Sequence, residues 1–300
     1  MELKLGLPLL GSLLIVRKRR ARKTFSPERM FLEEPKSNFA EAIRTVRTGV
    51  VLSGLDNPHK IVAVTSTVPG EGKTTVSMNL SLALGQMERV LLVDADLRKP
   101  LVNKYYGLPI GPGLTDYVLG NYHWHEVTNT ISDIMLGDFG IDDILKTPGM
   151  DTLHIITAGT KPPNPSEILT SHRFREFLKE ARNTYDFIFI DAPPVMPVAD
   201  ASDIATLVDG VILVYLIGKI GRGVLRRVKA NLENVDARLT GVILNKVKSD
   251  AGPDYYQYHS YYYYGNEPEV KKGKKVKKVK KAKRSKKSKH SKPNRKVFSS

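Results

Sequence analysis

The 300-residue chain contains no cysteine, which excludes disulfide bonds, thiolate metal sites and a cysteine nucleophile. It also lacks a hydrophobic run long enough to span a bilayer, which requires about 20 residues. The longest apolar stretch at the N-terminus, Leu5 to Val16, has only 12 residues and contains a proline and two glycines. A secretory signal peptide is not indicated, because the basic residues at 17–23 follow the apolar run instead of preceding it.

Acidic residues are absent from the last 30 positions. Residues 271–300 hold 16 of the 47 Lys and Arg residues, so residues 1–270 balance 31 basic against 31 acidic side chains despite the net charge of +16. Positive charge is therefore concentrated at 17–23 and 271–300, two candidates for contact with anionic lipid. Nucleic-acid binding by the tail would be nonspecific, and no specific nucleic-acid partner is expected. The apolar segment beside residues 17–23 is expected either to dock on a domain or to lie next to a membrane.

One stretch, IVAVTSTVPGEGKTT from Ile61 to Thr75, predicts a buried strand, a phosphate-binding loop and the start of a helix. Glycines allow the backbone N–H groups to approach an anion closely. Lys73 is expected to reach the β and γ phosphates, and the Thr74 hydroxyl to bind Mg²⁺. The usual first glycine of the loop is Thr67 here. The predicted nucleotide-binding residues are Pro69, Gly70, Glu71, Gly72, Lys73, Thr74 and Thr75.

Two further apolar strands end in aspartate. The strand Arg89 to Asp94 is followed by Asp96, and the strand Asp186 to Asp191 by Ala192 and two prolines. Carboxylates at the C-terminal ends of parallel strands lie in the crevice where open α/β sheets bind ligands. We expect Asp191 to hold Mg²⁺ through water. Asp94 and Asp96 can serve separate tasks, one near Mg²⁺ and one near an attacking hydroxyl, although either one alone could be a helix cap.

The remaining periodicity predicts a helix from Ser37 to Ser53, a strand from Thr152 to Ala158, and a helix from Asn164 to about Ala181. The strands Val211 to Leu216 and Thr240 to Asn245 follow, with a helix between them. Asn245 and Lys246 could face a nucleotide base. The predicted fold is α/β, a P-loop NTPase-type, mostly parallel sheet with helices on both faces and flexible N- and C-terminal extensions.

Seven of the 13 tyrosines lie within ten residues. The run lacks the aliphatic neighbours of a core strand, so we expect it to be flexible. It could offer an aromatic surface for stacking on bases, or pack against a partner subunit. Its members are Tyr255, Tyr256, Tyr258, Tyr261, Tyr262, Tyr263 and Tyr264.

From about Ser37 to Gly265 the chain resembles the bacterial tyrosine kinases of capsular and exopolysaccharide production. The resemblance rests on STVPGEGKTT (66–75), VLLVDADLRKP (90–100), FIFIDAPP (187–194), EAIRTVR (41–47) and the tyrosine cluster. LGLPLLGSLL (5–14) is also similar to the segment after the second transmembrane helix of polysaccharide co-polymerases that carry their kinase in the same chain.

The resemblance implies an ATP- and Mg²⁺-dependent protein-tyrosine autokinase with Lys73, Asp94, Asp96 and Asp191 as catalytic residues. It makes Asp94 the base for the tyrosine hydroxyl, and Thr74, Asp96 and Asp191 the Mg²⁺ ligands. The seven clustered tyrosines become phosphoacceptors, modified in trans within a ring-like homo-oligomer. Spacing alone favours a solvated helix face for Glu41, Arg44 and Arg47, but the family's E-x-x-R-x-x-R motif assigns these residues to ring assembly.

The resemblance also suggests a domain division. We expect a membrane-proximal or linker segment with a basic cluster (1–36), a kinase domain (37–250), a flexible tyrosine cluster (251–270) and a disordered lysine-rich tail (271–300). The tail is not part of the family pattern. Without a transmembrane helix, the kinase would need a membrane co-polymerase as a separate activator, or the chain is truncated from a fused protein. We expect a cytoplasmic protein, peripheral at the inner face of the bacterial cell membrane.

Two rival interpretations remain at this point. A partitioning or site-placement ATPase of the same P-loop branch would carry an additional lysine early in the loop, where this chain has Val68. A nucleotide-dependent scaffold with little kinase activity would regulate polymer export by assembling and dissociating.

Overall fold

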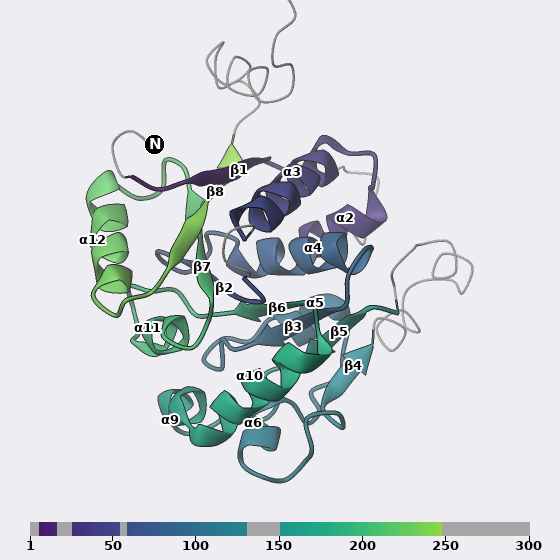
Figure 1. Cartoon of the computed structure of the whole chain (residues 1–300). Coiled ribbons are helices and arrows are strands. Elements are labelled where there is room, and N and C mark those ends of the chain that lie inside the picture. Colours follow the sequence, from purple (N-terminus) through teal and green to yellow (C-terminus); the bar gives the residue numbers. More distant parts are fainter. Residues whose placement is uncertain (1–5, 17–25, 55–58, 131–150, 248–300) are drawn as a thin grey trace, which may run out of the picture. The chain divides into compact units, whose positions relative to one another are not determined.

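The computed structural model describes residues 6–16, 26–54, 59–130 and 151–247. Within these ranges eight strands form one sheet in the order β1-β8-β7-β2-β6-β3-β5-β4, and every pair is parallel except β4 with β5. This arrangement confirms the predicted α/β class (Figure 1). The strands are β1 (Leu9–Leu14), β2 (Ile61–Ser66), β3 (Val90–Asp94), β4 (Thr128–Thr130), β5 (Leu153–Ile156), β6 (Phe187–Asp191), β7 (Gly210–Leu216) and β8 (Leu239–Val247).

Helices cover both faces of the sheet, as Figure 1 shows. One face carries η1 (Pro27–Arg29), α2 (Met30–Glu33), α3 (Asn38–Ser53), α4 (Lys73–Gly85) and α5 (Val102–Tyr106). The other face carries α6 (Leu114–Val118), α9 (Pro165–Thr170), α10 (His172–Thr184), α11 (Asp200–Ala205) and α12 (Arg222–Glu233). Two hydrophobic clusters result, one on each side of the sheet.

Strands β2 and β3 are buried at every position because both of their faces are covered. In β2, Ile61 and Ala63 belong to one hydrophobic cluster and Val62 and Val64 to the other, as the two-residue period of a strand requires. Because helices cover both faces, a ligand can reach the sheet at the ends of its strands. The carboxyl ends of β2, β3 and β6 lie next to one another there, since β6 pairs with both β2 and β3.

Local capping explains two helix boundaries. The Ser37 hydroxyl accepts a hydrogen bond from the Ala40 N–H at 3.1 Å, so α3 begins where the sequence predicted. The single helix predicted from Asn164 to Ala181 is wrong, because two helices occupy this range. Ser171 is extended, and its hydroxyl accepts from the Phe174 N–H at 3.1 Å, which starts α10 as a separate helix.

The N-terminal segment is part of the fold. β1 pairs in parallel with β8 at one edge of the sheet, and Leu10 and Leu13 are buried. A Cβ on Gly11 would come within 2.7 Å of the Val46 side chain, so α3 packs closely on this strand. Of the two alternatives for the apolar segment, docking on the domain is the one found, and the expectation of a linker through residue 36 needs correction. Within the described ranges, no helix combines the length and hydrophobicity needed to cross a membrane.

Candidate active site

The Glu71 side chain holds the phosphate loop in its conformation through hydrogen bonds. This side chain is fully buried, and its Oε2 accepts from the backbone N–H of Thr67 at 2.7 Å and of Val68 at 3.0 Å, and from the Thr67 hydroxyl. Its Oε1 accepts from the Leu216 N–H of β7 at 3.0 Å. The Glu71 side chain does not line the pocket and has a structural role, so the predicted nucleotide contact at this position would have to come from its backbone N–H. The Thr67 that replaces the usual glycine supplies two of these donors.

The two loop glycines adopt positive φ, +82° at Gly70 and +97° at Gly72. A Cβ on Gly72 would overlap Nδ2 of Asn245, which donates to the Glu71 carbonyl at 2.7 Å. The Asn245 side chain therefore supports the loop, and its contacts do not agree with the hypothesis that it faces a nucleotide base. Lys246, with φ of +54°, lines the pocket. Position 72 therefore requires glycine, both for its positive φ and for the close approach of the Asn245 amide.

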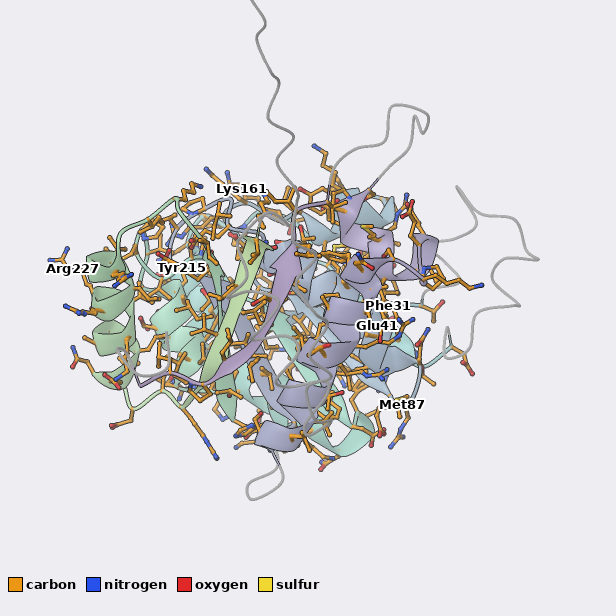
Figure 2. The ribbon with its side chains drawn as sticks, turned by 90° about the horizontal axis from the view of Figure 1, so that it is seen from above. Phe31, Glu41, Met87, Lys161, Tyr215 and Arg227 are labelled. Atoms are coloured by element: carbon orange, nitrogen blue, oxygen red, sulfur yellow. The ribbon has the colours of Figure 1, made fainter. Side chains whose placement is uncertain are left out.

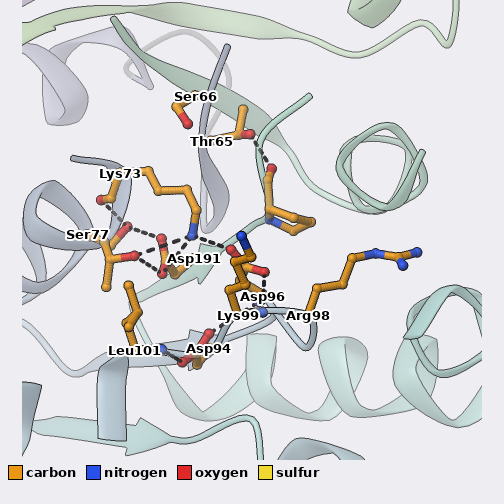
Figure 3. A network of polar contacts seen from close by, with 12 residues as sticks. Thr65, Ser66, Lys73, Ser77, Asp94, Asp96, Arg98, Lys99, Leu101 and Asp191 are labelled. Atoms are coloured by element: carbon orange, nitrogen blue, oxygen red, sulfur yellow. Dashed lines mark hydrogen bonds and ion pairs between the residues drawn. The ribbon is translucent and has the colours of Figure 1, made fainter. Parts of the chain in front are cut away.

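Lys73 lies between two carboxylates (Figure 3). Its Nζ is 3.0 Å from Oδ2 of Asp96 and 3.3 Å from Oδ2 of Asp191. Burial alone would lower the pKa of Lys73, but the charges of Asp191 and Asp96 outweigh burial and raise this pKa. The ammonium group therefore stays charged and can bind phosphate oxygens.

Asp191 is buried at the end of β6 and binds the loop helix. Its Oδ2 accepts from the Thr74 hydroxyl at 2.7 Å and its Oδ1 from the Ser77 hydroxyl at 3.1 Å. Burial raises the pKa of Asp191 above its ordinary value. Among the described residues no group of three or more His, Asp or Glu side chains is arranged to hold a metal ion. One hydroxyl with two nearby carboxylates fits Mg²⁺, which usually takes one or two carboxylates, water and substrate phosphates.

Asp94 and Asp96 have different surroundings, as Figure 3 shows. Asp94 is fully buried and accepts three backbone hydrogen bonds, from Asp96 at 3.2 Å and from Leu101 and Val102 at 3.1 Å each. The pKa of Asp94 is raised to about 7, mainly because the carboxyl is buried and secondly because Asp191 is negatively charged. Asp96 lines the pocket and Asp94 does not.

These elements surround a pocket of about 380 Å³. Sequence reasoning missed several of its residues. Arg98 and Lys99 follow Asp96 directly and could have been found from that position, whereas Glu28 and Tyr105 have no local signal. The lining residues are Glu28, Pro69, Gly70, Gly72, Lys73, Thr74, Thr75, Asp96, Arg98, Lys99, Leu101, Tyr105, Pro193, Pro194, Pro197, Val198 and Lys246.

Comparison with known proteins adds to this geometry. The AAA domain family model matches residues 59–220. Tyrosine-protein kinase YwqD of Bacillus subtilis is 33% identical over 228 residues, 76% of this chain and 89% of that protein. Tyrosine-protein kinase CpsD of Streptococcus agalactiae is 33% identical over 234 residues, 77% and 92% of the two chains. The chain belongs to the bacterial tyrosine-protein kinases.

Solved structures agree with this assignment. The kinase domain of Escherichia coli tyrosine kinase ETK matches this kinase with a TM-score of 0.71 and 27% identity, covering 82% of this chain and 93% of that one. The chimerical protein CapA2B2 matches with a TM-score of 0.70 and 29% identity, covering 83% and 98%. The family expected from the sequence motifs is confirmed.

The charged face of α3 carries the three residues predicted for ring assembly. Arg44 pairs with Glu41 at 2.5 Å, lies over the Phe31 ring at 5.3 Å and donates to the Pro35 carbonyl at 2.8 Å. Arg47 donates to the Ala83 carbonyl of α4 at 3.0 Å. Arg44 thus contacts both Glu41 and Phe31, the two residues that Figure 2 labels on this side of the kinase. The clustered tyrosines at 255–264, the lysine tail and the basic residues at 17–23 lie outside the described residues.

Proposed function

We propose that this kinase transfers the γ-phosphate of ATP to tyrosines 255–264 of a neighbouring copy, and so regulates capsular or exopolysaccharide polymerisation and export. The observation that carries the proposal is the Lys73, Asp96 and Asp191 cluster at the phosphate loop, in a chain whose sequence also holds seven clustered tyrosines. Transfer to a hydroxyl moves the phosphoryl group from the leaving oxygen of ADP to the phenolic oxygen, which loses its proton.

The roles follow from the contacts. The loop amides and Lys73 bind the phosphates, while Thr74 and Asp191 would hold Mg²⁺, which leaves Asp96 for the proton of the acceptor hydroxyl. When bound, Mg²⁺ supplies positive charge that neutralises the β and γ phosphate oxygens. Phosphoryl transfer needs positioning and charge neutralisation more than covalent help from the protein. These residues therefore supply the positioning and the charge neutralisation that the transfer needs.

The acceptor's proton needs a carboxylate within reach, because the tyrosine pKa is near 10. The family resemblance gives this role to Asp94, yet its carboxylate accepts three backbone hydrogen bonds and lies outside the pocket lining. We assign proton acceptance to Asp96, which lines the pocket. Asp94 then has a supporting role, since it fixes the turn at 101–102 that leads into α5.

Assembly completes the proposal. We propose a ring of copies in which Glu41, Arg44 and Arg47 of α3 contact the neighbouring copy, so that the tyrosine cluster of one copy enters the pocket of the next. The kinase would act with a membrane co-polymerase at the inner face of the cell membrane, and the basic residues at 17–23 and 271–300 would contact anionic lipid. In this division residues 9–247 form the kinase domain, 251–270 the acceptor segment and 271–300 the basic tail.

A mixing experiment tests transfer between copies. One chain carries Lys73→Met and intact tyrosines, and the other carries Phe at all seven clustered tyrosines with an intact pocket. With Mg-ATP and the membrane activator, we expect phosphotyrosine on the Lys73→Met chain only when both chains are present. Phosphate that appears in wild-type protein but never on the Lys73→Met chain would contradict transfer in trans. A Lys73→Met sample alone is the control.

A further inference from the structure

The nucleotide pocket contains a carboxylate that the phosphate chemistry does not use. Glu28 lies on η1 and lines the pocket. Its Oε1 accepts from the Thr75 hydroxyl at 3.1 Å, and its Oε2 from the Ser26 hydroxyl at 2.8 Å. A carboxylate repels the phosphates of a nucleotide, so its place in this pocket calls for a hydrogen-bond donor on the ligand.

The backbone that carries Glu28 is fixed to the loop helix by Asn79 of α4. The Asn79 side chain is fully buried, and its Nδ2 donates to the carbonyls of Pro27 at 2.9 Å and Glu28 at 3.0 Å. Its Oδ1 accepts from the Phe31 N–H at 2.8 Å. The carboxylate is therefore held in one place relative to the phosphate loop before any ligand arrives, which reduces the entropy cost of a contact.

Glu28 and Lys73 contact different residues of the pocket. Lys73, which reaches the β and γ phosphates in such loops, contacts Asp96 and Asp191. Glu28 instead contacts Thr75, one residue beyond the hydroxyl expected at Mg²⁺. The donors of a nucleotide are its ribose hydroxyls and the amino group of its base, since its phosphates carry none, and of the two the ribose lies nearer to the phosphates that the loop binds.

We propose that Glu28 accepts a hydrogen bond from a ribose hydroxyl of the bound nucleotide. The inference rests on the proposed function, because it takes ATP as the ligand. Carboxylates hold ribose hydroxyls in the same way in dinucleotide-binding folds. The N-terminal segment then contributes directly to ligand selection, in addition to the phosphate loop.

Calorimetric binding of ATP, 2′-deoxyATP and 3′-deoxyATP in the presence of Mg²⁺ tests the inference on the full chain. A hydrogen bond to a charged acceptor corresponds to about tenfold in affinity. We expect the wild-type kinase to bind ATP about tenfold more tightly than at least one deoxynucleotide. Glu28→Ala reduces this ratio below about twofold. Glu34→Ala, in the same segment but outside the pocket lining, keeps the wild-type ratio.

Several outcomes would overturn the inference. The first is an unchanged ratio of ATP affinity to deoxynucleotide affinity in Glu28→Ala, and the second is equal binding of all three nucleotides by the wild type. The third is a preference for ATP over inosine triphosphate that Glu28→Ala removes while the ratio of ATP affinity to deoxynucleotide affinity stays the same. The last result would place Glu28 at the base amino group. If Glu28→Ala does not fold, Glu28→Gln keeps the side-chain shape and should reduce the ratio to about threefold. Absence of any ATP binding by the wild type would overturn the proposed function as well.

Discussion

Replacement of Asn79 by alanine should destabilise the kinase strongly, because Asn79 joins the N-terminal segment to the loop helix. The substitution removes the hydrogen bonds that Nδ2 donates to the carbonyls of Pro27, Glu28 and Thr75, and the one that Oδ1 accepts from the Phe31 N–H. Alanine is otherwise well suited to a helix interior, so helix propensity would not explain a loss of stability.

The magnitude follows from the three bonds that join Asn79 to residues 27, 28 and 31. Each contributes about 1 kcal/mol net, and the Phe31 N–H left without a partner in a buried position adds a penalty of about 1 kcal/mol or more. We therefore expect Asn79→Ala to lower the free energy of unfolding by about 3–4 kcal/mol. That is a large part of the roughly 5–15 kcal/mol by which a folded domain is typically stable.

Urea unfolding followed by circular dichroism measures this change. Asn231→Ala provides a matched control, because Asn231 is exposed on α12 and should change stability by less than about 0.5 kcal/mol. Proteolysis should also cut residues 26–36 faster in Asn79→Ala than in the wild type. A loss below about 1 kcal/mol, with unchanged proteolysis, would refute the view that this segment is an integral part of the kinase.

Three further predictions concern the site and its supports. Asp96→Asn should reduce the rate of phosphotyrosine formation about 100-fold or more, and more than Asp94→Asn does; a larger effect of Asp94→Asn would return the role of base to Asp94. Gly72→Ala should weaken ATP binding at least about tenfold in calorimetry, because φ is positive at this position and an added methyl group would overlap the Asn245 amide; unchanged affinity would contradict this. Although burial alone would raise the pKa of Asp116, hydrogen bonds from Thr160 outweigh it and lower this pKa. The stability that Asp116 contributes is therefore present above about pH 4 and is lost as pH falls below that value. The difference in unfolding free energy between the wild type and Asp116→Asn should shrink from about pH 6 to about pH 3. A difference that stays constant over this range would refute the argument.

The sequence could predict those parts of this kinase that depend on a few adjacent residues. The strand, loop and helix from Ile61 onward, and the aspartates that end β3 and β6, each follow from a few adjacent residues. The structure brings Lys73, Asp96 and Asp191 together because these strands are neighbours in the sheet.

Long-range contacts account for what sequence reasoning missed. β1 is a strand because β8, more than 200 residues later, offers an edge to pair with. Glu28 reaches the pocket through Thr75 and Asn79, which nothing near residue 28 reveals. Glu71 looked like a ligand contact because it lies in the loop, but its carboxylate is satisfied by Leu216 of β7. The break at Ser171 had a local signal, a serine that can cap α10.

Phosphotyrosine mass spectrometry of the intact protein tests the central claim most directly. The wild-type kinase and Lys73→Met are each incubated with Mg-ATP and the membrane activator. Tyrosine transfer to the chain's own cluster predicts phosphate on residues 255–264 of the wild type and none on Lys73→Met. Absence of phosphate from all seven tyrosines of the wild type, under conditions in which ATP binds, would contradict the claim.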